Sequence, residues 1–342
     1  MHFDTSLGFG TDLKDVPALA GAVEALGFDA LWTSETQHDP FLPLALAAAH
    51  TQRIQLGTAV AIAFARSPTV LAHTAWDLAK LSGGRFILGL GTQVKAHIER
   101  RFGMSWGPPV TRLREFIQTL RAVWECWQNG TRLNVRGEHY KLTLMTPFFS
   151  PPPIEHPRIP IYIAGVGAPL CRLAGEVADG FVVHPYHTPK YLAEIIRPSI
   201  AEGAKKAGRS AGDVAVSGTV FVALDQAERE AIRAQISFYA STPSYRPVLE
   251  FHGWSAVGEK LSALAARGQW GEMSALVGDE MLEAFAVVAG WDTLAEQVAA
   301  RYAGLVDRIG FYRAYAPGSD DARWREAVAR LRGERGDADE RG

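Results

Sequence analysis

Short apolar segments alternate with longer amphipathic ones along most of the chain, a pattern typical of repeated strand and helix units. Between the apolar segments, helical periodicity is clearest after the fourth, where apolar residues from Leu113 to Trp127 share one face. Ser67-Pro68 has the residue types that begin a helix, and Gly83-Gly84 has those that end one. The eight segments predicted to be strands are 2–9, 28–34, 54–60, 85–89, 159–164, 180–184, 214–223 and 306–312.

Eight strands with intervening helices predict an α/β fold, a closed (β/α)8 TIM barrel. Two regions break the rhythm, 130–157 after the fourth helix and 237–290 between strands seven and eight, and we interpret both as insertions. Without them the chain approaches the ~250 residues typical of one barrel. We therefore expect a single domain over 1–332. Residues 333–342 are charged and lack an apolar anchor, so a disordered tail is expected there.

Composition narrows the class of protein further. Hydrophobic residues make up 47% of the chain, and the formal net charge is −2, so the positive field of a nucleic-acid binder or of a binder of anionic membranes is absent. No apolar run approaches the ~20 residues of a membrane-spanning helix, and no secretory signal is visible. The two cysteines, Cys126 and Cys171, have no paired spacing. A cytoplasmic protein with buried, inert thiols is expected.

In a parallel barrel the functional residues follow the carboxyl ends of the strands. Glu35 and His38 follow the second predicted strand, and a carboxylate and an imidazole there are candidates for general acid and base work. The alternative has equal weight: Glu35 pairs locally and His38 is a solvated loop residue.

The next strand ends carry small and polar residues. Ala59 and Val60 end the third strand, where small residues leave room for a flat ring to approach the backbone, although composition alone favours ordinary packing of the barrel interior. Thr92 and Gln93 follow the fourth strand and offer hydrogen bonds. Their glycine motif is not a dinucleotide fingerprint, because Val94 stands where a third glycine is required.

Gly165, Val166 and Gly167 follow the fifth strand and lead directly into a helix. Glycines that expose backbone amides ahead of a helix N-terminus form a natural phosphate cradle, although helix entry after a strand often uses glycine anyway. His184 and His187 follow the sixth strand, but no carboxylate or cysteine nearby completes a metal site. We expect a ring contact to substrate or cofactor there, and no metal.

Several motifs occur in a characteristic order. They are Leu-Gly-Thr-Ala-Val at 56–60, Arg66-x-Pro68, Gly-Gly-Arg-Phe at 83–86, Leu-Gly-Leu-Gly at 88–91, Ile-Ala-Gly at 163–165 and Ala-Asp-Gly-Phe at 178–181. Together they resemble the luciferase-like family of flavin- and deazaflavin-dependent oxidoreductases. The resemblance runs from residue 1 to about 185, and more weakly through the last strand. It is greatest to the branch that uses the deazaflavin F420.

This resemblance implies that F420, or alternatively FMN, binds across the rim, with the amides of 165–167 at its phosphate. It also implies a non-prolyl cis peptide at Ala59–Val60, against the ring. Relatives often carry a histidine where this chain has Thr36, and some F420-dependent sugar-phosphate dehydrogenases carry a catalytic glutamate where it has Val94. That dehydrogenase activity is therefore not expected.

The function that the resemblance implies is hydride transfer between the deazaflavin C5 and an organic substrate, with His38 or His184 exchanging the proton and Glu35 as the third catalytic candidate. The alternatives are an FMN-dependent two-component monooxygenase and, less favoured, a non-catalytic flavin-binding protein. The expected partners are a small-molecule substrate and a flavin or F420 reductase. A homodimer is expected, since relatives are often dimers; the Trp-rich fourth helix either supplies that interface or simply packs on the barrel. The two insertions are expected to cover the substrate.

Overall fold

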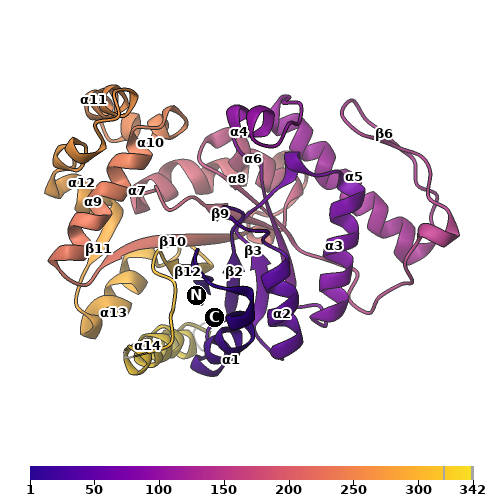
Figure 1. Cartoon of the computed structure of the whole chain (residues 1–342), viewed down its shortest axis with the longest axis horizontal. Coiled ribbons are helices and arrows are strands. Elements are labelled where there is room, and N and C mark those ends of the chain that lie inside the picture. Colours follow the sequence, from indigo (N-terminus) through magenta and orange to yellow (C-terminus); the bar gives the residue numbers. More distant parts are fainter. Residues whose placement is uncertain (319, 340–342) are drawn as a thin grey trace.

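Eight short apolar strands close into a parallel barrel surrounded by helices, as the alternating pattern predicts (Figure 1). The computed structural model describes residues 1–318 and 320–339. Around the barrel the strands follow in the order β1 (His2–Ser6), β2 (Ala30–Thr33), β3 (Gln55–Thr58), β5 (Phe86–Gly91), β8 (Ile161–Gly165), β9 (Gly180–Val183), β10 (Ala215–Ala223) and β12 (Arg308–Phe311), which pairs back with β1. The (β/α)8 TIM barrel is confirmed.

The strands are mostly shorter than their apolar segments, because the last apolar residues of several segments belong to rim loops instead. The first segment, for example, was expected to remain a strand to Phe9, but β1 ends at Ser6. Two further short strands extend the sheet: β4 (Ala61–Ile62) pairs with β5, and β11 (Ala286–Val288) pairs with β10.

The outer helices begin and end where the turn residues predict. The Ser67 side chain accepts a hydrogen bond from the Val70 amide and caps α3, while Gly83 and Gly84 take positive φ angles just beyond its end. The helices around and above the barrel are α1 (Val16–Leu26), α2 (Leu42–His50), α3 (Pro68–Leu81), α4 (Lys95–Arg100), α5 (Pro109–Asn129), α6 (Ala168–Val177), α7 (Pro189–Tyr191), α8 (Arg197–Lys206), α9 (Gln226–Ala240), α10 (Arg246–Phe251), α11 (Ser255–Ala266), α12 (Asp279–Phe285), α13 (Trp291–Tyr302) and α14 (Asp321–Asp339).

The apolar stripe of α5 packs inside the molecule. The indole of Trp124 donates a hydrogen bond to the Ala72 carbonyl of α3, and the rings of Trp76 and Trp127 meet edge to face with centroids 5.6 Å apart. Both tryptophans of α5 are buried. Of the two uses considered for this stripe, packing against the barrel is therefore the one observed.

The two insertions lie at opposite ends of the long axis of the molecule (Figure 1). The first contains a small hairpin, β6 (Val135–Arg136) with β7 (Lys141–Leu142), and projects away from the barrel. The second contains α10, α11 and α12. At the end of the chain, α14 continues to Asp339, past the point where a tail was expected to begin, and 340–342 lie outside the described residues.

A buried ion pair in the barrel joins the neighbouring strands β12 and β1. Arg308 on β12 donates two hydrogen bonds to the Asp4 carboxylate on β1, at 2.8 and 2.9 Å, and the indole of Trp32 donates a third at 2.9 Å. Glycine is required beside the Trp32 ring, since a Cβ at Gly57 would lie 2.3 Å from it. The interior is therefore filled by side chains, as in other barrels of this kind.

The cysteines behave as the sequence predicts. Cys126 and Cys171 are buried and unpaired, and burial raises the pKa of the Cys171 thiol to about 12. Across residues 1–318 and 320–339, no helix combines the length and the apolar composition needed to cross a membrane.

Candidate active site

A cavity of about 740 Å³ opens at the carboxyl ends of the barrel strands, a volume typical of small-molecule sites. The Ala59–Val60 segment after β3 and the Gly165–Gly167 turn after β8 both line it. The expectation that these two strand ends meet at one site is therefore confirmed. Leu7 and Phe9, which follow β1, also line the cavity.

The wall after β3 is held by backbone hydrogen bonds. The Ala59 amide donates to the Thr33 carbonyl at 2.6 Å, and the Glu35 amide donates to the Val60 carbonyl at 3.2 Å. The peptide bond between Ala59 and Val60 is cis, as the family resemblance implies. Val60 also requires a glycine beside it, because a Cβ at Gly91 would lie 2.6 Å from its Cγ2.

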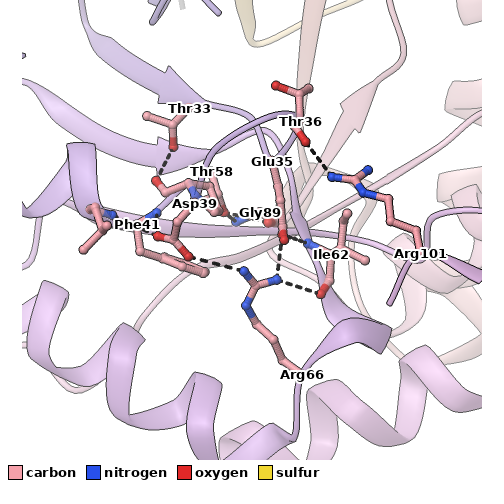
Figure 2. A network of polar contacts seen from close by, with 12 residues as sticks. Thr33, Glu35, Thr36, Asp39, Phe41, Thr58, Ile62, Arg66, Gly89 and Arg101 are labelled. Carbon is pink, nitrogen blue, oxygen red and sulfur yellow. Dashed lines mark hydrogen bonds and ion pairs between the residues drawn. The ribbon is translucent and has the colours of Figure 1, made fainter. Parts of the chain in front are cut away.

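Glu35 faces the cavity but its carboxylate is already bound within the protein (Figure 2). Oε2 accepts a hydrogen bond from Arg66 Nη1 at 2.6 Å and another from the Ile62 amide at 2.7 Å. Arg66 also donates to the Ile62 carbonyl at 3.2 Å. These bonds join the loop after β2 to β4, so Glu35 helps to hold the Ala59–Val60 wall in place.

His38 does not reach the cavity. Its side chain is exposed, and it is not among the residues that line the wall. The neighbouring Asp39 has a structural role, since its Oδ1 accepts hydrogen bonds from the Phe41 and Leu42 amides at the start of α2. Of the two interpretations left open for this loop, local pairing of Glu35 and solvation of His38 match the observed positions.

Thr92 and Gln93 line the cavity next to the Val60 wall. Gln93 has φ +56°, an uncommon angle for a residue other than glycine, and its side-chain oxygen accepts a hydrogen bond from the Val94 amide at 3.0 Å. The Thr92 hydroxyl donates to the Gln93 carbonyl at 3.1 Å. These bonds give the segment after β5 a defined shape at the cavity edge.

The turn after β8 has the geometry of an anion cradle. Gly167 caps α6, and within the described chain neither its amide nor that of Val166 donates a hydrogen bond to another protein group. A side chain would not fit at Gly165, because its Cβ would lie 2.6 Å from the Cβ of Leu170. Backbone donors at a helix N-terminus favour a phosphate or a carboxylate.

His184 follows β9 and sits among aromatic rings that the sequence did not bring together. Its ring stacks on Tyr245 with centroids 4.5 Å apart and meets Tyr239 edge to face at 4.7 Å. Its Nε2 lies 3.1 Å from the Tyr245 hydroxyl, and its Nδ1 accepts a hydrogen bond from the Tyr186 amide at 3.1 Å. Burial, with a smaller contribution from nearby His187, lowers the pKa of His184 to about 3.

Three tyrosines of the cavity wall were missed by sequence reasoning: Tyr239, Tyr245 and Tyr312. Tyr312 directly follows β12, so the rule that function follows strand ends could have found it. Tyr239 and Tyr245 belong to the second insertion, whose periodicity carries no comparable signal. The first insertion, 130–157, supplies no residue to the wall, so its expected place over the substrate was wrong.

The cavity has little net charge of its own. Its only ionisable carboxylates are Asp4 and Glu35, each bound to an arginine, and no lysine or arginine of the described chain lines it. In the same described ranges, no group of three or more histidine, cysteine or acidic side chains is arranged to hold a metal ion. The site can therefore offer apolar surface, hydroxyl groups and backbone amides.

Comparison with known proteins places the chain in a family. The luciferase-like monooxygenase family matches residues 1–308. A Mycobacterium tuberculosis protein whose name assigns no function is 48% identical over 296 residues, covering 85% of this chain and 87% of that protein. The 5,10-methylenetetrahydromethanopterin reductase of Archaeoglobus fulgidus is 31% identical over 286 residues, which cover 80% of this chain and 82% of that protein.

Solved structures show the same fold. The coenzyme F420-dependent tetrahydromethanopterin reductase of Methanopyrus kandleri superposes with a TM-score of 0.78 at 24% identity, covering 97% of this chain and 99% of that one. The chain belongs to the luciferase-like monooxygenase family and is an enzyme of the oxidoreductase class.

Proposed function

We propose that the protein is an F420-dependent oxidoreductase that moves a hydride between the deazaflavin C5 and a small organic substrate. The observation that carries this proposal is the meeting of the Ala59–Val60 wall and the Gly165–Gly167 turn in one cavity of about 740 Å³. A flat ring and an anionic tail need these two surfaces at the same site.

The residues present fit such a cofactor. The amides of Val166 and Gly167 are available to an anionic tail, and the missing side chain at Gly165 lets the turn pack against Leu170 at the start of α6. Ala59 and Val60 would support the ring from below, with Glu35 and Arg66 holding their segment. Thr92 and Gln93 would bound the ring at its edge.

The bound cofactor would supply the hydride chemistry, and the chain would supply positioning, exclusion of water and proton management. Because the carboxylate of Glu35 is held by Arg66 and the Ile62 amide, we assign it a positioning role in place of proton transfer. His38 lies outside the cavity wall, so the proton exchange is assigned to the end of the cavity where His184 and Tyr245 stand.

The names of similar proteins support F420 as the cofactor. The Methanopyrus kandleri structure is named for coenzyme F420, and the Archaeoglobus fulgidus relative is named for the same kind of reductase. A second Mycobacterium tuberculosis protein, 30% identical over 301 residues, carries a provisional name as a coenzyme F420-dependent oxidoreductase. Other proteins of the same fold are named as monooxygenases, and one of those structures contains FMN.

The test is equilibrium binding of F420, FMN, FAD and NADPH to the purified protein, followed by fluorescence and absorbance. We expect saturable binding of F420 and its reduction or oxidation in the presence of substrate. Tight FMN binding without F420 binding would overturn the proposal in favour of the two-component monooxygenase. Oxygen uptake with a separate flavin reductase would then be the activity to measure.

A further inference from the structure

Tyr239, Tyr245 and Tyr312 form one cluster across the cavity from the Ala59–Val60 wall. In the closed barrel, β10 is four strands away from β3 in either direction, so the two strands face each other. Tyr239 lies on α9, which follows β10, and its hydroxyl is 2.9 Å from that of Tyr312, whose amide bonds to β10 at the Val220 carbonyl. A ring resting on the β3 wall therefore has its free face toward this cluster.

His184 contacts Tyr245 of this cluster. The other hydrogen bond of His184 determines whether the Tyr245 hydroxyl is the acceptor or the donor in this contact. The Nδ1 atom of His184 accepts the Tyr186 amide proton, so it carries no hydrogen of its own. A neutral imidazole then has its hydrogen on Nε2, and burial keeps this ring neutral by lowering its pKa to about 3. The 3.1 Å contact is thus a bond from His184 Nε2–H to the Tyr245 oxygen.

Tyr245 is consequently left with its own hydroxyl hydrogen to donate. In the described part of the chain, this hydroxyl has no partner other than His184. Tyr245 lines the cavity, and burial raises the pKa of its hydroxyl to about 12, so the hydroxyl stays protonated at neutral pH. Its hydroxyl hydrogen is therefore available to an occupant of the cavity that Tyr245 lines.

The charge of the wall restricts what that occupant can be. Both lining carboxylates are neutralised by arginines, and the described lining contains no cation to match a carboxylate or phosphate of the substrate. An unpaired charge in such a site would cost several kcal/mol. Phe9 and Val94 add apolar surface at the mouth, where they are 58% and 43% exposed.

We propose that the substrate is an uncharged organic molecule with a carbonyl or hydroxyl oxygen, and that Tyr245 donates a hydrogen bond to that oxygen while His184 positions Tyr245. This inference rests on the proposed function, since it places the substrate against the free face of the cofactor ring. If a bound, reduced cofactor supplied a hydride to a carbonyl carbon, the carbonyl oxygen would take the hydroxyl proton of Tyr245. The C=O π bond would become a C–H and an O–H bond, and solvent would reprotonate the tyrosine.

The experiment compares two probes with the same ring, cyclohexanone and cyclohexanecarboxylate. Each is titrated into protein labelled with 13Cζ-tyrosine, with and without saturating oxidised F420, and the Tyr245 resonance is assigned with Tyr245→Phe. We expect cyclohexanone to bind saturably and to shift the Tyr245 signal, and the carboxylate to do neither. Tyr245→Phe should weaken cyclohexanone binding by about tenfold, the loss of one hydrogen bond, and leave F420 binding unchanged.

Tyr302→Phe is the matched control, because Tyr302 is buried away from the cavity and its hydroxyl has no partner in the described chain. It should bind cyclohexanone like the wild type. The proposal is overturned if the carboxylate binds as well as the ketone, if cyclohexanone shows no saturable binding, or if Tyr245→Phe keeps wild-type affinity. Failure of F420 to bind would instead count against the proposed function, since the titration without cofactor still reports on Tyr245.

Discussion

The Oε2 atom of Glu35 lies 2.6 Å from Nη1 of Arg66, and both side chains are largely shielded from solvent, at 9% and 18% exposure. The same oxygen accepts a hydrogen bond from the Ile62 amide (Figure 2). A carboxylate with two such donors is poorly placed to accept a substrate proton. It is well placed to accept the charged hydrogen bonds that hold the segment from Val60 to Ile62 in position.

Glu35→Gln should therefore act on stability and on cofactor binding more than on the chemical step. Loss of a charged hydrogen bond of this kind costs about 1.5–3 kcal/mol, measurable by urea unfolding, and F420 affinity should fall because the Ala59–Val60 wall loosens. Asp39→Asn is the control, since its contact with Arg66 is longer, at 3.5 Å, and more exposed. A variant of wild-type stability whose turnover alone falls by a hundredfold or more would restore Glu35 as a base.

The turn after β8 offers a pair of glycines with different steric demands. A Cβ at Gly165 would lie 2.6 Å from Leu170 Cβ, whereas at Gly167 the nearest atom is 3.6 Å away, on Pro169. Gly165→Ala should displace the turn and weaken F420 binding by about tenfold or more, while Gly167→Ala should bind nearly as the wild type does. Fluorescence titration of both variants tests this. Equal affinities would show that the anionic tail is bound elsewhere.

His187, which is buried, and His184, which is half-buried, make stability depend on pH. Burial lowers the pKa of His187 to about 4 and of His184 to about 3, below the unfolded value of about 6.5. Between these values the unfolded chain binds more protons, so the stabilising contribution is complete above pH 6.5 and is lost as pH falls toward 4.

His187→Gln should consequently flatten the pH dependence of the unfolding free energy. From pH 7 to pH 5, the wild type should lose up to about 2 kcal/mol more than the variant. Urea unfolding of both proteins at the two pH values gives the change in unfolding free energy of each. The contributions of the other titrating groups are common to both proteins and cancel in the difference. Parallel pH profiles for the two proteins would mean that His187 is not held neutral by the fold.

The Asp4–Arg308 pair in the barrel should be sensitive to loss of one partner. Arg308→Met leaves the Asp4 carboxylate buried with only the Trp32 indole as a donor, and a broken buried pair typically costs 3–5 kcal/mol. The double variant Asp4→Leu with Arg308→Met should recover part of that loss, because no unpaired charge remains. Urea unfolding decides the outcome; a loss below about 1 kcal/mol for Arg308→Met would contradict it.

The sequence by itself determined the fold class, because strand and helix periodicity and the turn residues act locally. Ser67-Pro68 and Gly83-Gly84 begin and end α3 as expected. The same local signals located the Ala59–Val60 and Gly165–Gly167 strand ends, and barrel closure then places all strand ends on one rim.

Only the tertiary structure decided what each rim side chain contacts. Glu35 and His38 are three residues apart in the chain, yet one is bound by Arg66 at the cavity and the other is exposed. Tyr245 meets His184 across 61 residues, through an insertion whose path no local pattern specifies. Such pairings depend on how separate elements pack, and periodicity within each element carries no information about its partner.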